Sequence, residues 1–153
     1  MNLNDANNIA NQIVRNLMLS ERGWKVSWNR RKTSAGLCRY RTRELQFSIP
    51  VSQMATEEEF RETVLHECAH ALAGHAAGHG PEWSRMLVSI GGTNTNARID
   101  GERAREIVQA TAKWQATCTT TGKVVMRSNR LTARQRTMIC TCHRSPIQWR
   151  PNS

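Results

Sequence analysis

The first feature of the chain is a helical pattern close to its start. Apolar residues recur every four positions from Ile9 and Ile13 onward, with small or apolar neighbours beside them. Side chains at this spacing share one face of a helix. The pattern therefore predicts a helix over residues 5–19, with Asn4 or Asp5 as its N-cap.

Three segments with alternating apolar and polar residues follow. The clearest are WKVSWN at residues 24–29 and ELQFSI at residues 44–49, and GLCRYR at residues 36–41 is a shorter candidate. Alternation with a period of two is typical of strands with one buried face, and short polar turns separate these segments. We therefore expect an antiparallel sheet of about three strands, which Pro50 ends.

A strong helix start comes next. Thr56 and Glu59 form a capping-box pattern, and acidic residues fill the first turn, where they favour the helix dipole. The apolar stripe that follows predicts a helix to about Gly74 or Gly78. Pro81, a residue favoured at the first helical position, begins a further helix.

The rest of the chain has weaker patterns. Asp100 is a candidate cap for a short helix that reaches about Thr111, and the residues after it read as short strands and turns. We predict an α+β fold with two parts. Residues 1–112 form the main domain, and residues 113–153 form a small basic β unit.

Composition narrows the class of protein. The chain has 153 residues, a length that favours one domain with a small appendage, and a net charge of +10. Lys and Arg gather in residues 22–46 and 107–153, and the second stretch has no acidic residue. Basic surfaces of this kind favour nucleic acid as a partner. No apolar run suggests a membrane span or a secretory signal, so we expect a cytoplasmic protein without a membrane partner.

The strongest chemical signal is HECAH at residues 66–70. His66 and His70 are four residues apart and share one face of a helix, so both imidazoles can bind one zinc ion. Glu67 lies beside the first ligand, in the position of a general base for hydrolysis. For the third ligand we favour His79, which follows a glycine that can end the helix. His75 is the alternative.

These residues resemble the SprT-like zinc metallopeptidases, the group that contains the Spartan proteases. The similarity lies in HECAHALAGHAAGHGPEW at residues 66–83 and in the upstream segments TSAGLCRYR and LQFSIP. The resemblance implies a zincin-like α+β fold, with zinc held by His66, His70 and His79 and with Glu67 as the general base. It also implies hydrolysis of peptide bonds in protein substrates, which in eukaryotic relatives are crosslinked or bound to DNA.

The tail departs from the zinc ribbon in which many SprT-like proteins end. Cys118 is present, but Thr121 stands where the family pattern has a second cysteine. Cys140, Cys142 and His143 are the remaining candidate ligands, and a structural zinc ion needs four ligands. The alternative is a β unit that has lost its metal and that apolar residues hold together.

Two functions from different classes fit the sequence. The first is a zinc-dependent metalloendopeptidase that acts on DNA-associated proteins. The second is a non-catalytic, zinc-containing DNA-binding module, in which the basic tail binds phosphates. An intact Glu67 favours the first, because a purely structural site needs no base. Candidate nucleic-acid contacts in the tail are Arg127, Arg130, Arg134 and Arg136.

Three further residues need an interpretation. We expect Cys38 and Cys68 to be buried small hydrophobic residues rather than nucleophiles. Tyr40, the sole tyrosine, is a weak candidate for stabilising the oxyanion.

Overall fold

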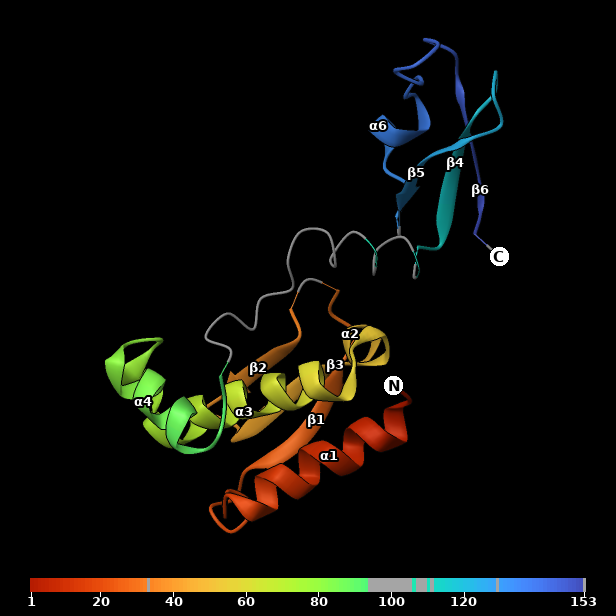
Figure 1. Cartoon of the computed structure of the whole chain (residues 1–153). Coiled ribbons are helices and arrows are strands. Elements are labelled where there is room, and N and C mark those ends of the chain that lie inside the picture. The colour runs from red at the N-terminus through yellow and green to blue at the C-terminus, as the bar shows by residue number, and fades with distance from the viewer. Residues whose placement is uncertain (33, 94–105, 107–109, 111, 129, 153) are drawn as a thin grey trace. The chain divides into compact units, whose positions relative to one another are not determined.

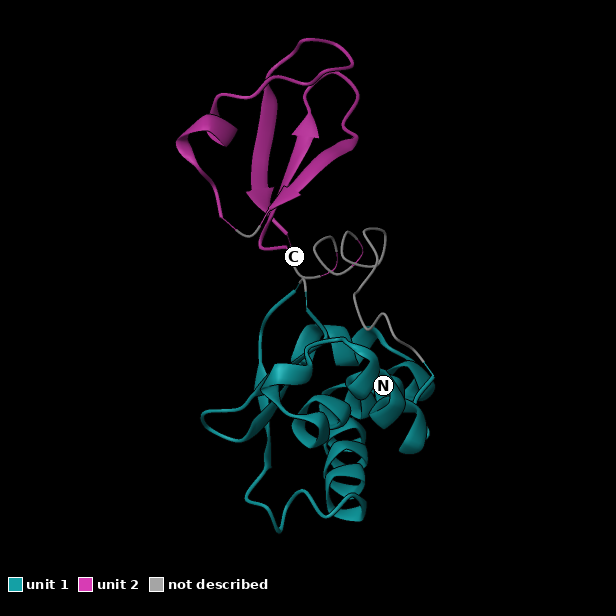
Figure 2. Cartoon of the chain, turned by 90° about the vertical axis from the view of Figure 1, so that its left-hand side faces the viewer, with its two compact units in different colours: residues 1–100 teal, residues 101–153 magenta. Residues whose placement is uncertain are grey.

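The computed structural model describes residues 1–32, 34–93, 106, 110, 112–128 and 130–152. The chain divides into two compact units, residues 1–100 and 101–153 (Figure 2). The boundary expected after residue 112 stays a prediction. The helix expected from Asp100 to about Thr111 lies almost wholly outside the described residues.

The first unit is built on a three-stranded sheet, as the alternating patterns predict. The strands are β1 (Lys25–Asn29), β2 (Gly36–Arg39) and β3 (Glu44–Ser48), in the spatial order β1-β3-β2. A salt bridge of 3.5 Å joins Lys25 and Glu44, which also face each other in the β1–β3 register. Because β3 lies between the other two strands, it is the centre of the sheet, and β2 is an edge strand.

The expectation of a purely antiparallel sheet is wrong. Strand β2 pairs with β3 in the antiparallel sense, but β1 pairs with β3 in the parallel sense. The reason is the position of β3, which inserts between its two predecessors, so that β1 and β2 are not neighbours. Periodicity identifies the faces of a strand, and it carries no information about which strand lies beside it.

Two long helices pack side by side against this sheet (Figure 1). They are α1 (Leu3–Asn16) and α3 (Glu57–Ala73). Their apolar faces meet the central strand at Leu45 and Phe47, both of which are fully buried. The buried core consists of Ala6, Ile9, Ala10, Ile13, Val14, Leu19, Leu45, Phe47, Phe60, Val64 and Cys68. Three of these residues, Phe60, Val64 and Cys68, belong to α3. Their burial determines the orientation of α3, and so the direction in which its histidines point.

Two helix starts differ from the sequence prediction. The N-cap of α1 is Asn2, whose side chain accepts from the backbone N–H of Asp5, so neither Asn4 nor Asp5 is the cap. Pro50 does end the sheet, but it also lies in the first turn of a helix that the sequence did not predict, α2 (Ile49–Met54). A proline lacks the N–H that the first turn leaves unpaired, so both outcomes follow from the same property.

The predicted capping box is confirmed. The Thr56 side chain accepts from the Glu59 backbone, and the Glu59 side chain accepts from the Thr56 backbone. Helix α3 ends at Gly74, whose φ of +87° favours glycine. A 3₁₀ turn, η1 (His75–Ala77), then leads to α4 (Pro81–Ser89), which begins at the predicted proline.

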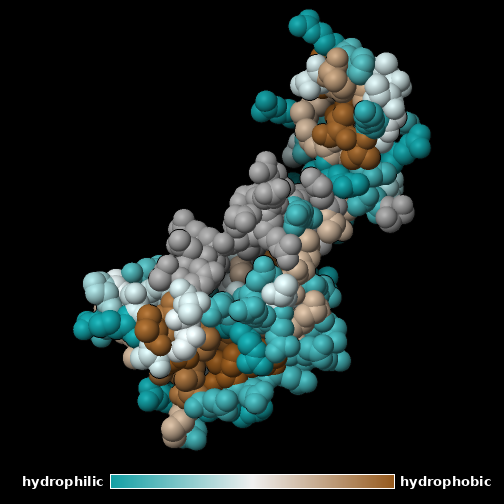
Figure 3. All heavy atoms as spheres, viewed as in Figure 1, coloured by the Kyte–Doolittle hydropathy of each residue, from teal (hydrophilic) through white to brown (hydrophobic). Residues whose placement is uncertain are grey.

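The second unit contains a small antiparallel sheet. Strands β4 (Trp114–Cys118), β5 (Val124–Ser128) and β6 (Ile147–Pro151) lie in the order β5-β4-β6, with a short helix α6 (Ala133–Arg136). Hydrophobic groups gather at the centre of the face seen in Figure 3, with hydrophilic groups around them. Few side chains are fully enclosed, and large hydrophobic residues with exposed surface are Val124, Val125 and Ile139. Because this unit buries so little apolar area, we expect it to need a further source of stability.

Among the described residues, no helix combines the length and the apolar character that crossing a membrane requires.

Candidate metal centre and active site

Three histidine rings converge beside α3. The His79 Nε2 atom lies 3.0 Å from the His70 Nε2 atom and 3.1 Å from the His66 Nε2 atom. In a tetrahedral zinc site with Zn–N bonds of about 2.0–2.1 Å, two ligand nitrogens lie about 3.3 Å apart. The three rings therefore fit a single metal ion. Their role as ligands stays a prediction.

Local structure explains how these side chains meet. His66 and His70 are one turn apart on α3 and are buried and half-buried, respectively. His79 comes from the loop before α4, where Gly78 has a φ of +52°. This conformation, which favours glycine, turns the chain back towards α3. The sequence prediction of His79 as the third ligand rests on a turn of this kind at the preceding glycine.

His75 lies apart from the three rings. Its imidazole packs edge-on against Tyr40, with ring centroids 5.1 Å apart, and it is exposed. It does not belong to the group of side chains that could hold one ion. The structure thus separates the two candidates for the third ligand that the sequence leaves open.

Trp83 packs against all three imidazoles. Its ring centroid lies 4.7 Å from that of His66, 5.2 Å from that of His70 and 4.7 Å from that of His79. The side chain is only 1% exposed. In the sequence Trp83 lies at the start of the helix predicted from Pro81, and this contact was not predicted. The available signal was its position four residues after His79, in the first turn of α4.

Glu67 is buried, with 5% of its surface exposed, and it lines the same cavity as the three histidines. Burial raises its pKa to about 8, although a hydrogen bond from the Cys38 backbone opposes the shift. The His70 pKa is lowered to about 4 by burial and by its neighbour His79. At neutral pH His70 is therefore uncharged, so its nitrogen lone pair is available to a metal. The Glu67 carboxyl group, by contrast, is largely protonated at neutral pH in the metal-free protein.

The cavity has a volume of about 620 Å³. One wall comes from α3 and the loop before α4, and the other comes from β2 and its flanking residues. Its lining includes Ser34, Gly36, Leu37, Cys38, Tyr40, His66, Glu67, His70, His79 and Trp83. A pocket with a few convergent polar groups and perturbed pKa values is a candidate active site.

Tyr40 and the two cysteines near the site have distinct environments. The Tyr40 hydroxyl donates to the His70 carbonyl at 3.2 Å, so in this structure the sole tyrosine ties β2 to α3. The expected burial is confirmed for Cys68, which is fully enclosed on the packing face of α3. It is wrong for Cys38, which is half-buried and reaches the cavity. Burial raises the Cys38 pKa to about 12, so the thiol stays protonated at neutral pH.

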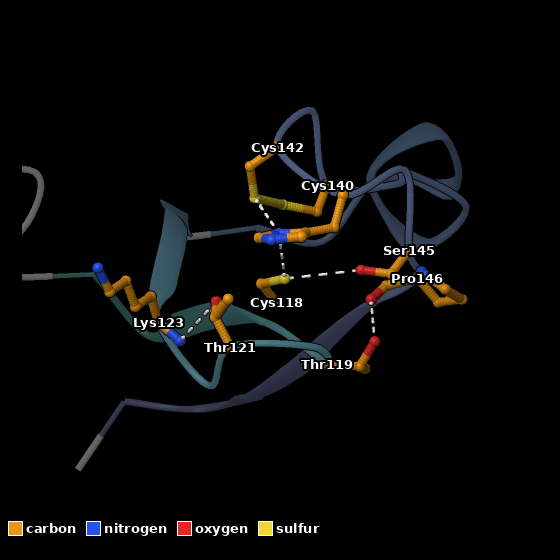
Figure 4. Close-up of a disulfide and its surroundings, with 9 residues drawn as sticks. Cys118, Thr119, Thr121, Lys123, Cys140, Cys142, Ser145 and Pro146 are labelled. Carbon is orange, nitrogen blue, oxygen red and sulfur yellow. Dashed lines mark hydrogen bonds between the residues drawn. A yellow bond between two sulfur atoms is a disulfide. The ribbon is translucent and has the colours of Figure 1, made fainter.

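A second cluster of metal-ligating side chains lies in the C-terminal unit (Figure 4). The ligand atoms of Cys118, Cys140, Cys142 and His143 all lie within 4.8 Å of one another. The Cys142 sulfur and the Cys118 sulfur lie 3.1 Å and 3.8 Å from the His143 Nδ1 atom. Cys142 and His143 thus approach the same point although they are adjacent in sequence, and neighbouring residues rarely both point at one metal ion.

When its cysteines are reduced, this cluster has the chemistry of a metal-binding site. Hydrogen bonds from Thr121 and Ser145 lower the Cys118 pKa to about 6, which favours the thiolate that a metal requires. Thr121, which stands where the family pattern has a cysteine, therefore supports the thiolate of Cys118. In the structure Cys140 and Cys142 form a disulfide, so a four-ligand site requires that this bond be reduced.

The four candidate arginines of the tail differ in exposure. Arg130 and the α6 residues Arg134 and Arg136 are exposed, whereas Arg127 of β5 is half-buried. The exposed three are available to a polyanion, and their contact with nucleic acid stays a prediction.

Comparison with known proteins gives concordant results. A model of the SprT-like family matches residues 4–103. Proteins named Protein SprT from Escherichia coli and Escherichia fergusonii are each 31% identical over 112 residues, which cover 70% of this chain and 67% of the relative.

Two solved structures are also similar. Each is a metallopeptidase zymogen, abylysin of Pyrococcus abyssi and jannalysin of Methanocaldococcus jannaschii. The first is 21% identical with a TM-score of 0.47, and it covers 69% of this chain and 90% of its own. The second is 19% identical with a TM-score of 0.48, and it covers 69% of this chain and 91% of its own.

Proposed function

The chain belongs to the SprT-like family, and we propose that it is a zinc-dependent metallopeptidase that cleaves DNA-associated proteins. The observation that carries the proposal is the placement of four side chains in one cavity. Three ring nitrogens, from His66, His70 and His79, converge to 3.0–3.1 Å, and the buried Glu67 lines the same cavity.

His66, His70 and His79 would hold the metal. Zinc supplies Lewis acidity there, because it polarises a carbonyl group and lowers the pKa of water towards ~7. The low pKa of His70 keeps this ligand neutral over the physiological range. Trp83 excludes water from behind the three rings and restricts their orientation.

Glu67 acts as the general base. Its carboxyl group lines the cavity that receives the substrate, and the positive charge of a bound metal ion would favour the ionised form that accepts a proton. The side chain accepts the proton of the attacking water and then passes it to the amine of the leaving peptide. A non-catalytic DNA-binding module has no use for a buried base at this position, so Glu67 favours an enzyme.

DNA is the partner that the charge distribution supports. Residues 107–153 carry eight Lys or Arg and no acidic residue. Arg134 and Arg136 project from the same short helix, and both are exposed. Arginines of this kind bind phosphates without regard to base sequence. A tail bound to DNA brings the protease to proteins that share the same DNA.

In the C-terminal unit, Cys118, Cys140, Cys142 and His143 would hold a structural zinc ion in the reduced protein. Their sulfur and nitrogen atoms are the ligand types of structural zinc sites. The small buried core of the unit gives such an ion a clear role in stability.

The direct test is cleavage of a DNA-bound protein by the zinc-loaded chain. We expect cleavage that a chelator abolishes and that Glu67→Gln reduces by on the order of 10³-fold while zinc stays bound. The matched control is Glu58→Gln, an exposed glutamate in the first turn of the same helix, which should cleave normally. Unchanged cleavage by Glu67→Gln would contradict the proposed role, and DNA binding without any cleavage would favour the non-catalytic module.

A further inference from the structure

The backbone of strand β2 passes very close to the Glu67 side chain. Gly36, the first residue of this edge strand, has no side chain, and a Cβ atom added to it would lie 2.6 Å from the Glu67 Oε1 atom. The same atom would lie 2.7 Å from Cγ and 2.9 Å from Cδ of Glu67. All three distances are below 3.0 Å, a separation that real Cβ atoms essentially never show.

Backbone conformation does not explain why glycine stands here. Gly36 is not among the glycines with a positive φ, so an alanine could adopt the same backbone dihedral angles. What glycine provides at this position is space. Gly92 and Gly80 are also tightly surrounded, but their nearest neighbours are Leu87 and the Ala77 carbonyl, outside the catalytic group.

The strand has little freedom to retreat from the helix. Gly36 pairs with Phe47 of the central strand, and Phe47 is fully buried. The Gly36 carbonyl also accepts a hydrogen bond of 2.7 Å from the Ser34 hydroxyl. A side chain at position 36 would therefore be accommodated by movement of Glu67.

Glu67 is held on its other sides as well. It is 5% exposed and lies in the middle of α3, between His66 and the fully buried Cys68. The Cys38 backbone, two residues along the same strand, donates a hydrogen bond to its carboxylate. Strand β2 thus provides both a donor and a space for the same carboxyl group.

We propose that Gly36 is a positioning residue for the general base, because the absence of a side chain allows the Glu67 carboxylate to lie against the edge strand and face the cavity. This inference rests on the proposed function for its catalytic part. The contact between the two residues can be tested without any enzymatic activity.

The first test is a double-mutant cycle on stability, measured in chelator so that metal binding does not contribute. We expect Gly36→Ala to lower the midpoint of thermal unfolding by roughly 5 °C, because it overpacks the contact with Glu67. In the Glu67→Ala background the same substitution should have no cost, because the space is then empty. The control cycle pairs Gly36→Ala with Glu58→Ala, which is exposed on the same helix, and its effects should add. An equal cost in both backgrounds would overturn the contact.

The second test separates kcat from KM in the zinc-loaded protein. A misplaced base affects the chemical step, so we expect Gly36→Ala to lower kcat by on the order of 10²-fold, with KM within about twofold and zinc content unchanged. A merely destabilised protein would lose active molecules and keep a normal kcat per folded, zinc-loaded chain.

The outcomes distinguish the two proposals. Wild-type protein that cleaves normally, together with a Gly36→Ala variant whose kcat is also normal, would refute the positioning role and leave the proposed function intact. Wild-type protein without peptidase activity would refute the proposed function and the catalytic part of this inference. The stability cycle would still decide whether Gly36 and Glu67 are in contact.

Discussion

Glu67→Gln should make the metal-free protein more stable while it removes activity. Burial raises the pKa of Glu67 from 4.5 to about 8, so the folded protein keeps a proton that the unfolded chain loses in this pH range. The free energy of unfolding therefore falls as the pH rises from 4.5 to about 8. The full shift corresponds to about 5 kcal/mol, since one pKa unit is worth about 1.36 kcal/mol. Movement of the side chain towards the open cavity lowers the measured value.

The neutral amide of glutamine removes this dependence on pH. We expect Glu67→Gln to exceed the wild type by at least about 2 kcal/mol at pH 9 and to match it near pH 4. His70 has the opposite dependence, because its folded pKa of about 4 lies below the ordinary value of 6.5. Stability lost through His70 as the pH falls below 6.5 affects both proteins equally, so it cancels in the comparison.

The assay is urea unfolding in chelator at pH 4, 6.5 and 9, with Glu58→Gln as the control for a change of charge on the same helix. Glu58 is exposed, so its substitution should leave the pH dependence of unfolding unchanged. Equal stability of wild type and Glu67→Gln at pH 9 would refute the argument that the fold holds the Glu67 carboxylate in a desolvated position that destabilises its charged form.

Three further predictions concern the two clusters of candidate metal ligands and the basic tail. Trp83→Ala should lower the free energy of unfolding by about 3–5 kcal/mol, measured by urea unfolding, and weaken zinc binding by about 10–100-fold, measured by calorimetry. Cys118→Ala should remove one zinc ion from the reduced protein, as determined by elemental analysis, and leave the metal at the histidines in place. A double variant with Arg134→Ala and Arg136→Ala should reduce the slope of log K for DNA against log salt by about 1.8, and a slope equal to that of the wild type would exclude these contacts.

Local patterns in the sequence were sufficient for the helix that carries the candidate site. The capping box of Thr56 and Glu59 depends on residues three positions apart, and the structure contains it as predicted. The i, i+4 spacing of His66 and His70 likewise fixes their common face once a helix forms. The parallel pairing of β1 with β3 was not predictable in this way, because it depends on which strands become neighbours.

The contacts that surround the site were the least predictable part. Neither Trp83 nor Gly36 was predicted as a site residue from the sequence, in which Trp83 lies at the start of a predicted helix and Gly36 at the start of a predicted strand. Their importance comes from neighbours that are distant in sequence, the three imidazoles for Trp83 and the Glu67 carboxyl group for Gly36. The sequence favoured His79 over His75 because a glycine precedes His79 and allows a turn. The structure places only His79 beside the other two rings.

The most direct test of the central claim is the zinc content of the reduced wild-type protein beside His79→Ala and His75→Ala. If His66, His70 and His79 bind one ion, His79→Ala should contain one zinc ion fewer per chain than the wild type. His75→Ala should contain the same amount as the wild type, because its ring packs on Tyr40 and lies outside the group. Equal zinc in all three proteins would contradict the account.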